Sequence, residues 1–283
     1  MKVCTKINEI RAILTQARTS GKSIGLVPTM GALHAGHASL IAASSARDDI
    51  TVVSIFVNPT QFAPNEDLAK YPRTFEADKQ LASAHGAQII FYPDVAELYP
   101  DGEPTWVEVT GDITKVLCGK SRPIHFRGVT TVVSKLFNII KPTRAYFGQK
   151  DAQQVQILKK MVRDLMFDLE LIVLPIIRES DGLALSSRNI YLSTSERAAA
   201  LVLSTSLQLA QSAFSQGERN PEKILTLVLN NIATEKLATV DYVEIWQLPD
   251  LTCCTNPMQA SNLLAVAVYF GKTRLIDNII LEA

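Results

Sequence analysis

Two histidines that are three residues apart follow the first strongly apolar segment of the chain. His34 and His37 belong to PTMGALHAGH (28–37), directly after the run SIGLV (23–27), which is typical of a buried strand. At a helix start, side chains three positions apart project from the same side, beside backbone N–H groups and the positive end of the helix dipole. The pattern predicts an anion site of nucleotide size. A structural role for either histidine is the alternative, as is a zinc site, although no third Cys, His or acid stands nearby.

Two later segments combine glycine, cations and hydroxyls in positions that suit phosphate. Lys150 and Asp151 follow the run RAYF in GQKD (148–151), and Ser186, Ser187 and Arg188 follow a DG turn in SSRN (186–189). Hydroxyls can donate to phosphate oxygens, and arginine supplies a permanent planar charge. Taken alone, the first segment is also typical of a solvated helix start, and the second of a polar turn that caps a helix.

Alternating strands and helices must position these segments. Helices are predicted near 7–17, 35–46, 74–85, 129–140 and 151–163, and strands at 23–27, 50–58, 87–92, 144–148 and 169–175. The alternation predicts an α/β fold with a doubly wound, mainly parallel, Rossmann-like sheet that binds ligands at the carboxyl ends of its strands. Helices at 194–215 and 221–233 and strands at 241–246, 263–271 and 273–281 follow. We expect a nucleotide-binding domain at 1–175 and a smaller α+β lid domain at 176–283.

The charge balance argues against nucleic acid and membrane as partners. The 283 residues carry 28 Lys plus Arg and 28 Asp plus Glu, so the net charge is zero and no general basic field arises. No signal sequence is evident, and no window approaches the roughly 20 apolar residues of a membrane span. We expect a cytoplasmic protein whose four cysteines, which form no CxxC pair, are reduced thiols.

Several long segments resemble one known family. PTMGALHAGHASLI resembles the HxGH segment of the nucleotidyl-transferase superfamily and, in its fuller form, the pantothenate synthetase family. FVNPTQFAPNEDLAKYPRT, RPIHFRGVTTVVSKLFNIIKP, YFGQKDAQQ and DGLALSSRNIYLS are similar to family segments in the same order, from about Ile24 to Leu192. The resemblance implies a homodimeric ligase that uses ATP with Mg²⁺ to join pantoate to β-alanine through a pantoyl-adenylate, releasing AMP and pyrophosphate.

The same resemblance implies roles for individual residues. His34, His37 and Lys150 would be catalytic, with His37 donating a proton toward the phosphate chain and Asp151 lying near the ribose. The serine segment would contact the β- and γ-phosphates and could close over ATP. The nucleotide would be bound by Met30, Gly31, Ala32, Leu33, His34, Ala35, Gly36, His37, Gly148, Gln149, Lys150, Asp151, Ile177, Leu185, Ser186, Ser187 and Arg188.

Amide side chains are implied around the acid substrate. Gln61 and Gln154 would bind pantoate, whose carboxylate and two hydroxyls match the donors and acceptor of a glutamine. Arg122 and His125 would position phosphate or β-alanine, or serve structure. At position 149 the family commonly carries glutamate, whereas Gln149 here offers a neutral amide that can still accept a hydrogen bond. The sequence indicates neither a base for the β-alanine amine nor a metal ligand.

Three other functions are compatible with part of this pattern. Another HxGH nucleotidyltransferase would let a phosphate monoester attack ATP or CTP and would leave the nucleotide in its product. A class I tRNA synthetase fits less well, because the chain is short and lacks a basic surface. A non-catalytic nucleotide sensor would keep the glycines but would not need both histidines, Lys150 and the serine segment.

Overall fold

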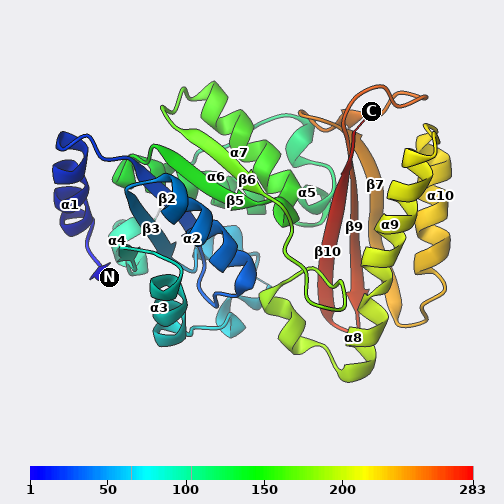
Figure 1. Cartoon of the computed structure of the whole chain (residues 1–283), viewed down its shortest axis with the longest axis horizontal. Coiled ribbons are helices and arrows are strands. Elements are labelled where there is room, and N and C mark those ends of the chain that lie inside the picture. Colours follow the sequence, from blue (N-terminus) through cyan, green and yellow to red (C-terminus); the bar gives the residue numbers. More distant parts are fainter. Residues whose placement is uncertain (65, 103, 283) are drawn as a thin grey trace.

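Six parallel strands form the larger of two sheets in this computed structural model, which describes residues 1–64, 66–102 and 104–282 (Figure 1). The strand order is β1-β4-β3-β2-β5-β6. The chain runs from β2 outward through β3 and β4, whereas β5 and β6 lie on the other side of β2. Ligands of α/β sheets bind where the order reverses, here between β2 and β5. The strands are β1 (Lys2–Cys4), β2 (Ile24–Thr29), β3 (Ile50–Ile55), β4 (Ile89–Phe91), β5 (Arg144–Gly148) and β6 (Glu170–Leu174).

Helices cover both faces of this sheet. On one face lie α1 (Ile7–Thr19), α6 (His125–Ile140) and α7 (Ala152–Asp164), and on the other α2 (Ala35–Arg47) and α3 (Phe75–Ala84). Strand side chains alternate between the two faces. In β2, Leu26 therefore belongs to the core under α1, α6 and α7, whereas Val27 belongs to the core under α2 and α3. The predicted doubly wound parallel fold is confirmed.

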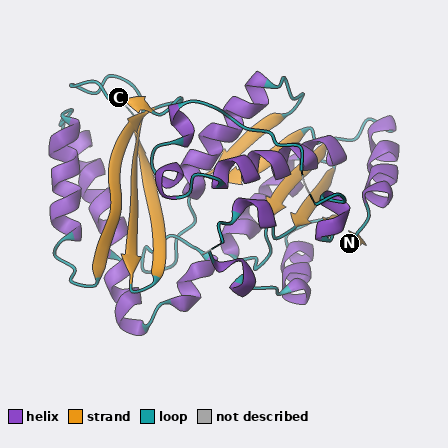
Figure 2. Cartoon of the chain, turned by 180° about the vertical axis from the view of Figure 1, so that it is seen from behind, coloured by secondary structure: helices purple, strands orange, loops and turns teal. Residues whose placement is uncertain are grey.

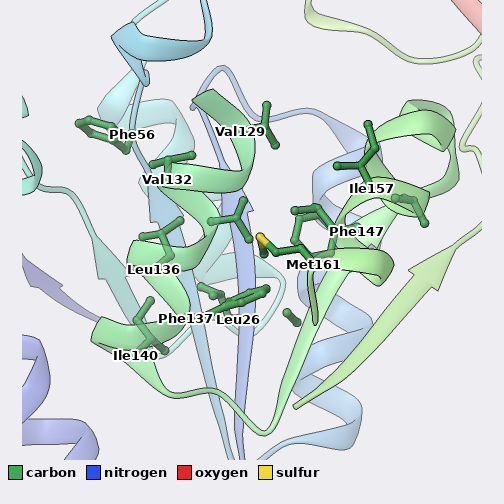
Figure 3. Close-up of a cluster of buried hydrophobic side chains, with 14 of the residues drawn as sticks. Leu26, Phe56, Val129, Val132, Leu136, Phe137, Ile140, Phe147, Ile157 and Met161 are labelled. Atoms are coloured by element: carbon green, nitrogen blue, oxygen red, sulfur yellow. The ribbon is translucent and has the colours of Figure 1, made fainter. Parts of the chain in front are cut away.

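Helix α6 is deeply buried beside the point where the strand order reverses, between β2 and β5. Its side chains Val132, Leu136 and Ile140 lie in the same cluster as Phe147 of β5 and Met161 of α7 (Figure 3). Of the 16 residues of α6, 13 are buried, and the buried set includes the polar side chains of Thr130, Thr131 and Ser134 beside the apolar ones. This packing holds the first turn of α6, with His125, against the carboxyl ends of the strands.

The second sheet is antiparallel and stands beside the first (Figures 1 and 2). Its order is β10-β9-β7-β8, from β7 (Ala238–Gln247), β8 (Thr252–Cys253), β9 (Asn262–Phe270) and β10 (Thr273–Leu281). Helices α9 (Val202–Ser215) and α10 (Pro221–Ile232) cover one face, where Val266 and Val268 are buried. On the other face, Leu263 and Ala265 join the core of the larger sheet. The two halves thus share apolar contacts, and the division at 175/176 stays a prediction.

Some local predictions were wrong. The single helix expected at 194–215 is interrupted at Leu201, between α8 (Thr194–Ala200) and α9. The strands β1 and β8 and the short helices α4 (Val95–Leu98) and α5 (Cys118–Ser121) were not predicted, because two to four residues are too few to establish a period. Within the described residues no helix has the length and apolarity needed to cross a membrane, and no cysteine is in a disulfide.

Candidate active site

A cleft at the carboxyl ends of β2 and β5 contains most of the predicted site residues. Although they are spread over half of the chain, the fold brings together Met30, His34, Gly36, His37, Gln61, Gly148, Lys150, Asp151, Gln154, Ile177, Leu185, Ser186, Ser187 and Arg188. The cleft also contains Arg122 and His125. Five other predicted nucleotide-binding residues do not line its wall, namely Gly31, Ala32, Leu33, Ala35 and Gln149.

In each of the two histidines, the ring nitrogen Nδ1 accepts a hydrogen bond from a backbone N–H at the start of α2. The N–H of Gly36 donates to Nδ1 of His34 at 3.1 Å, and the N–H of His34 donates to Nδ1 of His37 at 3.3 Å. Each Nδ1 is therefore an acceptor, so each neutral ring carries its proton on Nε2, on the side away from the helix. The ring centroids are 4.1 Å apart. A Cβ at Gly36 would lie 2.8 Å from the His34 ring, so only glycine leaves room for this arrangement.

Both imidazoles are neutral at physiological pH. Burial, assisted by the charge of Lys150, lowers the pKa of His34 from 6.5 to about 4. Burial, assisted by His34, lowers the pKa of His37 from 6.5 to about 3. The pair therefore offers two Nε2–H hydrogen-bond donors without adding charge to the cleft.

A buried carboxylate that sequence reasoning missed holds the loop before these histidines. Asp78 of α3 is 2% exposed and accepts from the N–H groups of Ala32 at 3.0 Å and Leu33 at 2.8 Å. Thr74 Oγ1 also donates to it at 3.0 Å. Ala32 has a left-handed backbone, with φ of 51°, which an L-residue rarely adopts without support. Asp78 supplies that support, and no local sequence pattern connects it with a loop more than forty residues earlier.

A buried amide network fixes the orientation of Gln61. Asn58 Nδ2 donates to Gln61 Oε1 and to the carbonyl of Gly128, both at 3.1 Å. Tyr99 donates its hydroxyl proton to Asn58 Oδ1 at 2.9 Å. Gln61 Nε2 in turn contacts Met30 Sδ at 3.2 Å, next to the histidine loop. Asn58 was not predicted as a site residue, although its place in NPTQ, three residues before Gln61, was a usable signal.

Apolar side chains form the wall between Gln61 and Gln154. Gln154 lies in the first turn of α7 and is partly exposed to the cleft. The lining between the two amides comes from α6 and the neighbouring strands and loops, through Phe56, Phe62, Val129, Val132, Val133 and Leu136. A ligand bound here would contact the two amides at its ends and the apolar side chains along its length.

Arg122 and His125 are already engaged with protein groups. Arg122 forms two short hydrogen bonds with the carboxylate of Glu66, at 2.6 and 2.7 Å, and its Nη1 donates to His125 Nε2 at 3.2 Å. His125 Nδ1 donates to the carbonyl of Gln61 at 3.0 Å. Burial, together with the charge of Arg122, lowers the pKa of His125 to about 4. Because both of its ring nitrogens are hydrogen-bonded, His125 has no free nitrogen that could act as a base. Its bond to the Gln61 carbonyl helps to position Gln61.

The Lys150 loop is held by the second sheet. Asn278 of β10 donates through Nδ2 to the carbonyl oxygens of Gln149 at 3.1 Å and Lys150 at 3.0 Å. Gln149 Nε2 donates to Asn278 Oδ1 at 3.1 Å. Gln149 thus acts as a donor in a structural contact, whereas the sequence suggested an acceptor. The Nζ of Lys150 is 4.0 Å from Asp151 Oδ1, within the cleft.

The serine segment is a short 3-10 turn with its own supporting network. Ser186 Oγ accepts from the N–H of Arg188 at 3.2 Å. Asn189 donates to Glu179 Oε1 at 2.8 Å and to the carbonyl of Ala184 at 3.1 Å. These bonds support the segment whose Ser186, Ser187 and Arg188 line the same cleft as the histidines. Among the described residues no cluster of three or more Cys, His, Asp or Glu side chains could hold a metal ion.

The chain is similar to known proteins over almost its whole length. A sequence model described as pantoate-beta-alanine ligase matches residues 2–280. The chain is 54% identical to the pantothenate synthetase of Acetivibrio thermocellus over 100% of both chains, and 55% identical to that of Pelotomaculum thermopropionicum over 99% of both.

Solved structures give the same result. The crystal structure of pantothenate synthetase from Thermus thermophilus has a TM-score of 0.94 and 39% identity, covering 100% of both chains. The pantoate-beta-alanine ligase of Francisella tularensis, complexed with beta-gamma ATP and beta-alanine, has a TM-score of 0.81 and 36% identity, covering 100% of this chain and 98% of its own. By sequence and by fold, the chain described here belongs to the pantoate-beta-alanine ligase family.

Proposed function

We propose that the cleft between β2 and β5 joins pantoate to β-alanine in two steps, with the residues above in defined roles. The chain is an ATP-dependent ligase of its family, and a carboxylate must first become a mixed anhydride with AMP before an amine can displace it. The roles are assigned from one observation. Two neutral imidazoles lie beside Lys150 in the cleft, and the Nδ1 atom of each accepts a backbone hydrogen bond, which leaves its Nε2–H group as a donor. Preorganised donors of this kind stabilise charge that develops on phosphate oxygens.

In the first step, His34 and His37 donate hydrogen bonds to the phosphate chain, and Lys150 supplies the cationic charge. Because burial keeps the histidine pKa values low, at about 4 and about 3, hydrogen-bond donation by the neutral rings fits better than release of a proton from an imidazolium. Ser186, Ser187 and Arg188 bind the departing pyrophosphate from the opposite wall. We propose that this segment also closes over ATP, so saturating ATP plus pantoate should protect it from protease cleavage at Arg188.

Pantoate fits the wall between the two glutamines. Gln61 and Gln154 would bind its carboxylate and hydroxyls, and the apolar side chains of α6 would contact its methyl groups. The Asn58–Tyr99 network holds Gln61 in one rotamer, so the amide is preorganised before the substrate binds.

The second step depends on positioning. The β-alanine amine attacks the pantoyl carbonyl, AMP leaves, and the amine loses a proton. His125 cannot accept that proton while Arg122 and the Gln61 carbonyl occupy its nitrogens. We therefore propose that a fixed adenylate and an oriented amine supply most of the acceleration, because well-oriented groups gain several kcal/mol, about 7–11 in favourable cases.

We propose Mg²⁺ as the metal that accompanies ATP. The carboxylate of Asp151 in the cleft, beside Lys150, is the kind of oxygen donor that Mg²⁺ accepts, and Mg²⁺ commonly uses one or two carboxylates together with substrate phosphates and waters. When bound, the ion would neutralise part of the phosphate charge.

The assembly and compartment are also proposals. The family resemblance supports a cytoplasmic homodimer built from 31.1 kDa subunits. Light scattering after size exclusion tests this, because a mass of one subunit rather than two would contradict the dimer.

The direct test of function is an assay for AMP. Purified protein is incubated with ATP, Mg²⁺, pantoate and β-alanine, and each substrate is then omitted in turn. AMP that requires both pantoate and β-alanine supports the ligase. A nucleotidyltransferase would instead leave the nucleotide in its product and release only pyrophosphate, so pyrophosphate without AMP would contradict the proposal.

A further inference from the structure

Two adjacent polar side chains on β10 are among the most deeply buried in the molecule. Asp277 is 2% exposed and Asn278 is 3% exposed, and β10 is the edge strand of its sheet. Neighbouring residues of a strand project to opposite faces, so the two side chains reach different segments from one point of the backbone. Both of those segments belong to the candidate active site.

Asn278 holds the backbone of the Lys150 loop. Its amide donates to the carbonyl oxygens of Gln149 and Lys150, at 3.1 and 3.0 Å, and accepts from the Gln149 side chain at 3.1 Å. All three bonds are partly buried, so their loss would leave polar groups with few alternative partners. The bond to Lys150 is made to its backbone carbonyl, so Asn278 acts on this residue through the backbone.

Asp277 holds the segment before the serine loop. It forms two hydrogen bonds with the guanidinium of Arg178, at 2.6 and 3.0 Å. Arg178 also donates to the carbonyl of Gly182 at 3.1 Å, inside a turn closed by a hydrogen bond from the N–H of Leu185 to the carbonyl of Ile177 at 3.0 Å. Ser186 follows this turn directly. Paired, charge-assisted bonds of this type fix orientation as well as distance.

We propose that Asn278 is a positioning residue for Lys150. Through Asn278 and Asp277, β10 fixes the positions of the Lys150 loop and the serine loop relative to each other. The inference rests on the proposed function of Lys150 in adenylation. A lysine has a long flexible stem, so its placement depends on the backbone from which it extends. A displacement of about 1 Å at a group that contacts the reacting phosphate can lower a rate by about 100-fold.

The test measures the first half-reaction by pantoate-dependent exchange between pyrophosphate and ATP. Asn278→Ala should lower the exchange rate constant by about 10- to 100-fold. Asn278→Asp, which keeps the size and the acceptor oxygen but loses both donated bonds, should show a similar loss. Leu275→Ala is the matched control. Leu275 lies on the same strand and is buried in the core under α9 and α10, so this change should lower Tm and leave exchange within about twofold.

A double-mutant cycle separates positioning from a general structural effect. If Asn278 acts through Lys150, then Asn278→Ala should lower exchange less than about threefold in a Lys150→Ala background. An equal loss in both backgrounds would overturn the proposal, and so would wild-type exchange in Asn278→Ala and Asn278→Asp. Absence of pantoate-dependent exchange in the wild-type protein would instead refute the proposed function itself.

Discussion

Asp78 is expected to be the principal support of the loop that precedes the two histidines. Replacing it with alanine removes the acceptor for the N–H groups of Ala32 and Leu33, at 3.0 and 2.8 Å. Hydrogen bonds to a charged group contribute about 1.5–3 kcal/mol each, and water can reach this half-buried loop and replace part of the loss. We therefore expect the free energy of unfolding to fall by about 2–4 kcal/mol. Asp78→Asn keeps one acceptor oxygen but turns its NH2 group toward one of the two backbone N–H donors, so it should lose a comparable amount.

The loss should appear in function as well as in stability. Without Asp78, the left-handed backbone at Ala32 has no compensating bond, so the loop relaxes and moves the backbone of His34. Pantoate-dependent exchange should fall by at least about tenfold with a higher KM for ATP, since the Nε2–H donors are displaced.

Urea unfolding and the exchange assay measure the two effects on the same samples. Glu76→Gln is the control, because Glu76 is an exposed acid on the same helix and its replacement should change stability by less than about 0.5 kcal/mol. If Asp78→Ala unfolds at the same urea concentration as Glu76→Gln and keeps exchange within about twofold, Asp78 does not hold the loop and the reasoning is refuted.

Three further predictions concern the same cleft. His37→Gln, whose Nε2 can replace the ring donor, should retain more exchange activity than His37→Ala, which should lose about 10²–10³-fold; equal losses would favour proton transfer by His37. Because the pKa values of His34 and His37 fall from 6.5 to about 4 and about 3 on folding, their contribution to the free energy of unfolding is complete above pH 6.5 and is lost progressively as the pH falls from 6.5 to about 4 for His34 and to about 3 for His37. Urea unfolding at a series of pH values should show this loss, and the double variant His34→Gln, His37→Gln should show a smaller one, because only His125, whose pKa also falls to about 4, still contributes among the buried histidines. Gly128→Ala would place a Cβ 2.4 Å from the carbonyl oxygen of Thr60 and 2.6 Å from the backbone of Gln61, so the KM for pantoate should rise at least about tenfold; an unchanged KM would show that Gln61 is not held by this contact.

Local sequence patterns were sufficient for the fold class, and they predicted the segments that the fold gathers around the cleft. The alternation of apolar strands with helices of ten to sixteen residues predicted the parallel sheet, because burial on both faces demands it. The histidines and Lys150 were predicted from their position after apolar strands, since ligands of such sheets bind at strand ends, whereas the serine segment was predicted from its hydroxyls and Arg188 after a DG turn. Asn58 could have been found in the same way, three residues before Gln61.

Long-range polar contacts were beyond the reach of the sequence. Asp78 and Asn278 each bond mainly to backbone groups of a distant loop, and any segment offers such groups whatever its sequence. The donor role of Gln149 and the engagement of His125 likewise depend on which partners the packed helices and strands bring within about 3 Å. The sequence by itself therefore determined the kind of chemistry and predicted the loops that would carry it. Only the tertiary structure decided which buried side chains hydrogen-bond to the backbones of those loops, because these contacts depend on the packing of elements far apart in the chain.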